Sequence, residues 1–216
     1  MNKKQFLQFK KMGVIIINYP SVYIDSTVTI EPNTVIYPNN HIFGHSHIHK
    51  CCILFPNNII NNCDIGEACE VTSSVLKDSQ FGHDCQIGPF AYIRPASYIG
   101  NNCRIGDFVE IKNSTVGDGT KVSHLAYIGD ASVGRKCNIG CGSIFVNYDG
   151  KTKQHIEVGD NSFIGSNCNL IAPLTIGKKC YICAGTTVTK NIADKSFVIG
   201  RTMAIEKENR SDKYLE

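Results

Sequence analysis

A hydrophobic residue recurs about every six positions along most of this chain, and a glycine often follows it. The run extends from Ile24 to Val188, with a break between Val71 and Phe81 and a longer gap between Phe145 and Val158. A period of six fits neither an amphipathic helix nor a simple alternating strand. A repeat of this length is typical of a parallel β-helix, in which three hexads make one triangular coil. The pattern therefore predicts an all-β fold of about nine stacked coils.

Composition limits the alternatives. The chain has 216 residues and 11 cysteines, with 22 basic and 19 acidic residues, so its net charge is +3. This balance does not favour nucleic acid or a membrane surface as a partner. No apolar run is long enough for a transmembrane helix, and the stretch 13–17 is too short for a signal peptide. We therefore expect a cytoplasmic protein.

Most of the cysteines lie two residues before a repeat aliphatic, a position that points into a narrow prism. These are Cys52, Cys63, Cys69, Cys85, Cys103, Cys137, Cys168 and Cys180. A free thiol behaves there as a small buried hydrophobe. The spacing favours core packing over disulfides, and unpaired thiols fit a reducing compartment.

The repeat also divides the chain. Residues 1–20 form a lead segment that could include a short helix, and residues 21–200 form the β-helix. The long gap in the period requires residues 146–157 to leave the prism as a loop, and loops on a rigid scaffold often carry sites. Residues 201–216 form a polar, charged tail that we expect to be poorly ordered unless a partner holds it.

Two cations are stacked by the repeat. Ile93 and Ile111 are three hexads apart, so Arg94 and Lys112 should lie one above the other on adjacent coils. They could be two solvated surface charges. The alternative is an anion site, because guanidinium and ammonium groups held one strand spacing apart repel each other unless an anion lies between them.

A longer column lies two residues after its repeat aliphatics. It runs over four coils through His124, Cys141, Ser166 and Ala184, provided that the loop 146–157 contributes no hexad. A lone histidine is more often structural than catalytic. Beside a large loop and a row of small residues, however, His124 could act as a general base.

A histidine cluster offers a metal alternative. His45, His47 and His49 should lie on one side of their strand, and His41 precedes them. A three-histidine zinc site occurs in γ-class carbonic anhydrases, which share this fold class. Since no second cluster in the sequence completes a site, we interpret this stretch as a polar outer face and assign no metal ligand.

Several longer motifs stand in order along the chain. They are Gly88–Pro95 (GPFAYIRP), Asp107–Lys112 (DFVEIK), His124–Asp130 (HLAYIGD), Asn138–Gly142 (NIGCG) and Asn147–Gly150 (NYDG). From about Gly13 to Arg201, the chain resembles the C-terminal acetyltransferase half of the bifunctional glucosamine-1-phosphate acetyltransferase and N-acetylglucosamine-1-phosphate uridylyltransferase family. The resemblance implies a left-handed β-helix and a homotrimer with acetyl-CoA between neighbouring subunits.

The same resemblance implies roles for individual residues. His124 would be the general base that takes a proton from the amine of glucosamine 1-phosphate, with Glu110 as the residue that orients it. The residues that would bind the sugar phosphate are Arg94, Lys112, Tyr127, Asn138 and Lys153. Those that would bind acetyl-CoA are Cys141, Asn147, Tyr148, Ser166, Ala184 and Arg201. The backbone N–H of Cys141 could stabilise the oxyanion.

The chain departs from the family in one large respect. Nothing in it resembles the family's N-terminal nucleotidyltransferase domain, so we expect no uridylyl transfer and a possible separate uridylyltransferase protein. The leading hypothesis is acetyl-CoA-dependent N-acetylation of glucosamine 1-phosphate, which feeds UDP-N-acetylglucosamine and peptidoglycan synthesis. The alternatives are acetyl transfer to another amino sugar or sugar nucleotide, and a non-catalytic hexapeptide scaffold.

Overall fold

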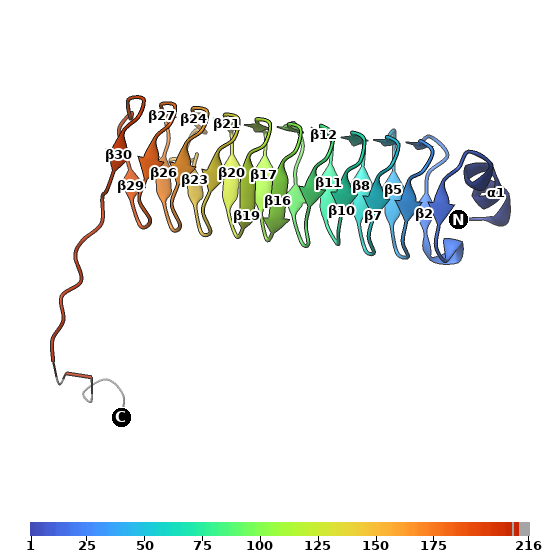
Figure 1. Ribbon diagram of the computed structural model, residues 1–216, viewed down its shortest axis with the longest axis horizontal. Helices are drawn as coiled ribbons and strands as arrows, with labels where there is room; N and C mark the ends of the chain where they lie inside the picture. The colour runs from blue at the N-terminus through green and yellow to red at the C-terminus, as the bar shows by residue number, and fades with distance from the viewer. Residues whose placement is uncertain (209, 212–216) are drawn as a thin grey trace.

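The computed structural model describes residues 1–208, 210 and 211, and it shows a long left-handed parallel β-helix (Figure 1). Helix α1 (Lys3–Lys11) lies at one end of the prism, and the segment after residue 200 leaves from the other end. Of the tail expected at 201–216, residues 209 and 212–216 lie outside the described residues. Neither helical segment of the described chain is long and apolar enough to cross a bilayer.

The strands form three parallel sheets, one on each side of the prism. The first sheet contains β1 (Ile15–Ile16), β4 (Val35–Ile36), β7 (Ile53–Leu54), β10 (Glu70–Val71), β13 (Gln86–Ile87), β16 (Arg104–Asp107), β19 (Lys121–His124), β22 (Asn138–Ile139), β25 (Phe163–Ile164), β28 (Tyr181–Ile182) and β30 (Phe197–Val198). The second sheet contains β2 (Tyr23–Ile24), β5 (His41–Phe43), β8 (Ile59–Asn61), β11 (Val75–Lys77), β14 (Tyr92–Ile93), β17 (Glu110–Lys112), β20 (Tyr127–Gly129), β23 (Ile144–Val146), β26 (Asn169–Ile171) and β29 (Thr187–Val188). The third sheet contains β3 (Thr29–Ile30), β6 (His47–Ile48), β9 (Asp64–Ile65), β12 (Ser79–Phe81), β15 (Ser97–Ile99), β18 (Thr115–Val116), β21 (Ala131–Val133), β24 (Ile156–Val158) and β27 (Leu174–Ile176).

Each repeat aliphatic points into the prism, and the residue before it in most cases points outward. Ile93, Ile105 and Ile111 are fully buried, and Ile93 lies in register with Ile111 on the next coil. Burying one such side chain contributes about 1.5–3 kcal/mol relative to leaving it exposed. The period of six thus produces a single continuous core along the prism axis, which confirms the predicted fold class.

The sheets contain 11, 10 and 9 strands in the described chain, which is about ten coils instead of nine. Three strands lie outside the aliphatic run that the period identified. They are β1, β11 and β30, whose inward residues are Ile16, Leu76 and Val198. Leu76 is fully buried but stands at a step of five on either side, which interrupts the period.

The cysteines occupy the interior as predicted. All eight at the small-residue position are buried, and every cysteine of the described chain is free. Cys85 Sγ, for example, donates to the Gly100 carbonyl at 3.0 Å. Cys180 and Cys183 stand at a C-x-x-C spacing, but both are buried and no metal-binding group in the described residues includes them. These thiols therefore fill the core.

Asparagines form many of the corners. Asn39, Asn57, Asn62 and Asn102 all have φ between 50° and 69°, the left-handed region that a tight corner requires. Asparagine tolerates this conformation better than other non-glycine residues. The side chains of corner asparagines on adjacent coils also bind each other: Asn39 Nδ2 donates to Asn57 Oδ1 at 3.2 Å.

The N-terminal segment closes the first coil. Asn2 caps α1, and Phe9 of this helix is buried against the end of the core. A short 3-10 turn, η1 (Tyr19–Ser21), follows β1. Because β1 already pairs with β4, the β-helix begins at residue 15, earlier than the expected boundary at residue 21.

The loop expected at 146–157 leaves the prism, but it spans only residues 147–155. Val146 still belongs to β23, and Ile156 begins β24 and is fully buried. Within the loop, Tyr148 and Lys153 form an isolated antiparallel bridge, and the Asp149 carboxylate accepts hydrogen bonds from two backbone N–H groups of the turn. The loop contributes no hexad to the β-helix. Its internal bridge makes a small hairpin that carries Lys153.

Candidate active site

The column predicted from the repeat lies at the corner between the first and second sheets. Val122, Ile139, Ile164 and Ile182 follow each other in register through β19, β22, β25 and β28. The residues two positions after them therefore stack over four coils at one strand spacing, about 4.8 Å. This places His124, Cys141, Ser166 and Ala184 in one row, as the sequence predicts.

The row extends one coil further, to Asp107. Asp107 and His124 are register partners in β16 and β19, and Asp107 Oδ1 lies 2.5 Å from His124 Nδ1. This hydrogen bond lowers the pKa of the Asp107 carboxyl, so the carboxylate stays charged around neutral pH. With Nδ1 held by the carboxylate, Nε2 is left as the nitrogen that can accept a proton.

The expectation that Glu110 orients His124 is wrong for this structure. Glu110 Oε1 accepts a hydrogen bond from Arg94 Nη1 at 2.7 Å, because both residues belong to the second sheet. Asp107 has the orienting position instead. It stands two residues after Ile105, the same offset as His124 after Val122, so the spacing that identified the column could also have identified it.

The small residues beyond His124 leave backbone groups accessible. Cys141 is exposed, and in the described chain its N–H donates no hydrogen bond. At the far end of the row, Arg201 folds back so that its Nη1 donates to the Ala184 carbonyl at 3.0 Å. Arg201, Ala184 and Cys141 therefore lie along the same corner, as their common assignment requires.

The second sheet carries the stacked cations. Ile93 and Ile111 are in register, so Arg94 and Lys112 occupy equivalent positions on adjacent coils. Each has an acidic partner: Arg94 binds Glu110, and Lys112 Nζ lies 3.5 Å from Asp130 Oδ2. The predicted stacking is confirmed, and these carboxylates offset the repulsion between the two cations.

Hydrogen bonds from two asparagines hold the Asp130 carboxylate in place beside Lys112. Its two carboxylate oxygens accept hydrogen bonds from Asn113 Nδ2, at 2.6 Å, and from Asn147 Nδ2. The Tyr127 side chain packs against the backbone of Gly129. A Cβ on residue 129 would be 2.3 Å from the Tyr127 hydroxyl oxygen and 2.8 Å from Asn147 Nδ2, so only glycine leaves room for both side chains. Asn147 is thus nearly buried among the residues expected to bind the sugar phosphate, away from the column of small residues.

Lys153 reaches this group from the loop. The neighbouring Lys112 ammonium lowers the pKa of Lys153, and Arg94 adds to the effect. In the described chain Lys153 forms no ion pair within 4 Å. Three cations therefore face two carboxylates, a balance that favours an anionic ligand such as a phosphate group.

The two remaining predicted residues are Asn138 and Tyr148. Asn138 is on β22 of the first sheet, in register with Lys121 and Phe163, whereas Arg94 and Lys112 are on the second sheet. Tyr148 is exposed in the loop, and its hydroxyl donates to the Gly150 carbonyl at 2.8 Å. Tyr148 is paired with Lys153 through the loop bridge, whereas no side-chain hydrogen bond or ion pair of the described residues joins Asn138 to either group.

The two groups lie at opposite ends of the second-sheet strands. His124 ends β19 just before this sheet, whereas Arg94 follows β14 and Lys112 ends β17, with Tyr127 at the start of β20 on the same sheet. The arrangement offers a proton acceptor at His124, a free backbone donor at Cys141 and a cationic patch on the adjoining sheet. These are the elements that acyl transfer to the amine of a phosphorylated substrate requires.

Comparison with known proteins places the chain among relatives with the same repeat. Residues 75–147 match the family model "GMPPB C-terminal domain", and residues 155–190 match "Hexapeptide repeat of succinyl-transferase". The chain is 50% identical over 193 residues to the bifunctional protein GlmU of Clostridium novyi (strain NT), an alignment that covers 89% of this chain and 42% of that protein. It is a hexapeptide-repeat protein related to the bifunctional GlmU proteins.

A second curated relative is similar to almost the whole of this chain. GlmU of Brevibacillus brevis is 42% identical over 213 residues, which cover 99% of this chain and 46% of that protein. The chain thus spans less than half the length of these curated relatives. Among solved structures, UDP-N-acetylglucosamine acyltransferase from Campylobacter jejuni aligns with 93% of this chain and 78% of its own, at 17% identity and a TM-score of 0.47.

Proposed function

We propose that this protein is an acetyl-CoA-dependent N-acetyltransferase that acts on glucosamine 1-phosphate. The observation that carries the proposal is the presence of two groups at either end of the second-sheet strands: His124, held by Asp107, and the patch of Arg94, Lys112 and Lys153. The relationship to bifunctional GlmU proteins supports the same reaction class.

The phosphate of the sugar would bind the cationic patch. Arg94 offers a planar pair of donors, and Lys112 and Lys153 offer ammonium groups. A bound phosphate would draw Lys112 and Arg94 partly away from Asp130 and Glu110. Its negative charge would also raise the pKa of Lys153, which the Lys112 ammonium lowers in the free protein. Tyr127, fixed above Gly129, would contact the sugar ring between the phosphate and the amine.

His124 would then act as the general base. Its Nε2 takes a proton from the attacking amine while the amine nitrogen bonds to the thioester carbonyl carbon. Asp107 keeps the proton of the neutral ring on Nδ1 and stabilises the imidazolium that forms. The tetrahedral intermediate collapses when its carbon–sulfur bond breaks, which releases the CoA thiolate and leaves the amide.

The acetyl-CoA would lie along the column of small residues. Cys141, Ser166 and Ala184 leave room beside the corner, and Arg201 at its end supplies a cation for a phosphate of the cofactor. The free N–H of Cys141 would donate to the oxyanion. Asn138, on the first sheet, enters this proposal through a neighbouring subunit, whereas Tyr148 lies beside Lys153 in the loop.

A homotrimer is part of the proposal. The corner beside His124 is open to solvent and carries a stripe of apolar side chains, Phe90, Phe108 and Leu125, each 58% exposed. The Phe90 and Phe108 rings stack with centroids 5.5 Å apart. A neighbouring prism that covers this stripe would bury it and would close the groove over the cofactor.

The test is thiol release from acetyl-CoA by the purified protein, with a panel of acceptors. Release that depends on glucosamine 1-phosphate supports the proposal. Release with another amino sugar or sugar nucleotide alone would move the substrate assignment. If no acceptor in the panel supports release, the protein is not an acetyltransferase of this class.

A further inference from the structure

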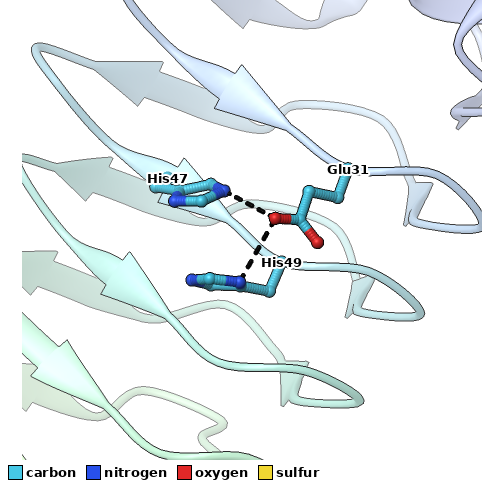
Figure 2. Close-up of side chains that lie close together, drawn as sticks. All are labelled: Glu31, His47 and His49. Atoms are coloured by element: carbon cyan, nitrogen blue, oxygen red, sulfur yellow. Dashed lines mark hydrogen bonds and ion pairs between the residues drawn. The ribbon is translucent and has the colours of Figure 1, made fainter.

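Four ionisable side chains converge on the third sheet, near the N-terminal end of the prism and on a different side from His124. Figure 2 shows Glu31, His47 and His49 pointing toward one another. Their positions follow from the register, because Ile30 pairs with Ile48 and His47 pairs with Asp64. Glu31 therefore lies beside His49 on one coil boundary, and Asp64 lies beside His47 on the next.

The distances match those between ligands of one metal ion. Glu31 Oε1 lies 3.0 Å from His47 Nε2 and 3.3 Å from His49 Nδ1, and the three residues can each offer one ligand atom within 4.8 Å of the others. Ligand atoms at 2.0–2.2 Å from a tetrahedral Zn²⁺ are about 3.3 Å apart. Only a small contraction would bring all three onto one ion.

A neutral His49 ring cannot satisfy both of its carboxylate contacts. Both of its ring nitrogens face a carboxylate oxygen: Nδ1 faces Glu31 at 3.3 Å, and Nε2 faces Asp64 at 2.9 Å. A neutral imidazole has one N–H, so one of these contacts sets a nitrogen lone pair against an oxygen. A second proton on the ring would satisfy both contacts, and a metal ion bound at one nitrogen would do the same without that proton.

A metal ion resolves the mismatch. If Nδ1 of His49 coordinates the ion, then its Nε2–H is free to donate to Asp64, which is the usual carboxylate–histidine–metal arrangement. Glu31 is held in place for this role, since its Oε2 accepts the Lys50 backbone N–H at 3.1 Å. The Lys50 ammonium is engaged elsewhere, 3.2 Å from Glu67.

We propose that Glu31 Oε1, His47 Nε2 and His49 Nδ1 bind a divalent metal ion of the zinc class, with Asp64 as the outer carboxylate that orients His49. Two imidazoles and one carboxylate suit Zn²⁺, Ni²⁺ or Co²⁺, whereas Mg²⁺ and Ca²⁺ prefer oxygen ligands alone. The two histidine side chains are 30–36% exposed, so an ion can enter from solvent and keep water in its remaining positions.

The sequence interpretation of this stretch changes in two respects. His45 does not join the group of described residues that could hold a metal. Glu31 completes the set from the coil before, which the histidine run alone does not reveal. The ion would join β3 to β6 and so stabilise the N-terminal coils, because a ligand that binds only the folded state raises stability.

The experiment is titration of the metal-free, reduced full-length protein with Zn²⁺ by calorimetry, and with Co²⁺ by visible absorption. We expect one equivalent to bind, with cobalt bands that lack sulfur charge transfer. His47→Gln and Glu31→Gln should each lower the affinity at least tenfold, and Asp64→Asn about 10- to 100-fold. The unfolding temperature of the wild type should rise with Zn²⁺, and that of His47→Gln should not.

Two matched controls separate this site from other donors. His83→Gln removes an exposed histidine that pairs with Asp84 at 2.6 Å, and Cys51→Ser removes an exposed thiol close in sequence. Both should keep wild-type affinity. Absence of saturable binding in the wild type, binding that survives in both His47→Gln and Glu31→Gln, or loss of binding in Cys51→Ser would overturn the proposal. Circular dichroism of the metal-free variants verifies that each is folded.

Discussion

Asp107 Oδ1 lies 2.5 Å from Nδ1 of His124, and the two residues are register partners on adjacent coils. The β-helix thus holds a carboxylate and an imidazole one strand spacing apart through backbone pairing alone. This relationship fixes which ring nitrogen can accept a proton, and it distinguishes Asp107 from Glu110 as the residue that orients the base.

Asp107→Asn should lower kcat for acetyl transfer on the order of tenfold, with a small effect on the KM for acetyl-CoA. The neutral amide no longer stabilises the imidazolium that forms during proton transfer. Because the pKa of Asp107 is lowered, the wild-type carboxylate stays charged as the pH falls toward 5, so this contribution should persist there. Steady-state kinetics of the wild type and the variant between about pH 5.5 and 8.5 measures the loss of kcat and its dependence on pH. This interval spans the usual pKa of an imidazole.

Glu110→Gln is the matched control for that variant. It should leave kcat nearly unchanged and alter the KM for the sugar phosphate, because Glu110 contacts Arg94. A larger loss of kcat in Glu110→Gln than in Asp107→Asn would restore the original assignment of Glu110 to the base.

Much of this geometry follows from the period of six. Once Ile105, Val122 and Ile139 are known to stack, every residue at a fixed offset is placed, which is how the column of His124 and Cys141 could be predicted. The same rule applied at offset two from Ile105 gives Asp107, and at offset one from Ile30 it gives Glu31. Neither residue was predicted, because a single carboxylate has no distinctive pattern in the sequence and gains its role only from the coil beside it.

The period does not predict residues that leave it. Asn147 stands where the chain departs from β23, and its contact with Asp130 depends on how the loop turns. The hairpin that presents Lys153 depends on hydrogen bonds to Asp149 within the loop. The skipped strand at Leu76 has a related cause, since two consecutive steps of five hide it from a six-residue period.

Lys153→Ala should raise the KM for glucosamine 1-phosphate about 10- to 100-fold while kcat changes little. The variant removes one of three cations from the proposed phosphate site, and charge-assisted hydrogen bonds to phosphate are among the stronger polar contacts. Lys151→Ala is the control, because Lys151 is exposed in the same loop. Equal KM values for the wild type and Lys153→Ala would remove Lys153 from the site.

Acetyl-CoA should protect Cys141 from alkylation but leave Cys51 reactive. Among the cysteines of the described chain, only these two are exposed. Cys141 lies in the proposed cofactor groove and Cys51 on a distant coil, so Cys51 is an internal control. Peptide mass spectrometry after brief treatment with iodoacetamide measures both. Protection of neither thiol, or of both equally, would contradict the placement of the cofactor.

The buried thiols should make the protein less stable in alkali. Burial raises the pKa of Cys63 from 9.0 to about 11. The unfolded chain therefore loses this proton at lower pH than the folded one, and stability that is complete below about pH 9 declines as the pH rises toward 11. The free energy of unfolding should fall by at most about 1.4 kcal/mol per pH unit for this group.

Urea unfolding under reducing conditions at pH 8 and pH 10 measures this decline. Cys63→Ala should show a shallower dependence on pH than the wild type, whereas Cys51→Ala should match the wild type. An unchanged slope in Cys63→Ala would mean that this thiol does not contribute.

The most direct test of the proposed chemistry compares the wild type with His124→Ala in thiol release from acetyl-CoA, with and without glucosamine 1-phosphate. The account predicts release that requires the sugar phosphate and falls about 10²- to 10⁴-fold in the variant, the usual contribution of a general base. Full activity in a folded His124→Ala protein would contradict the assignment of the base.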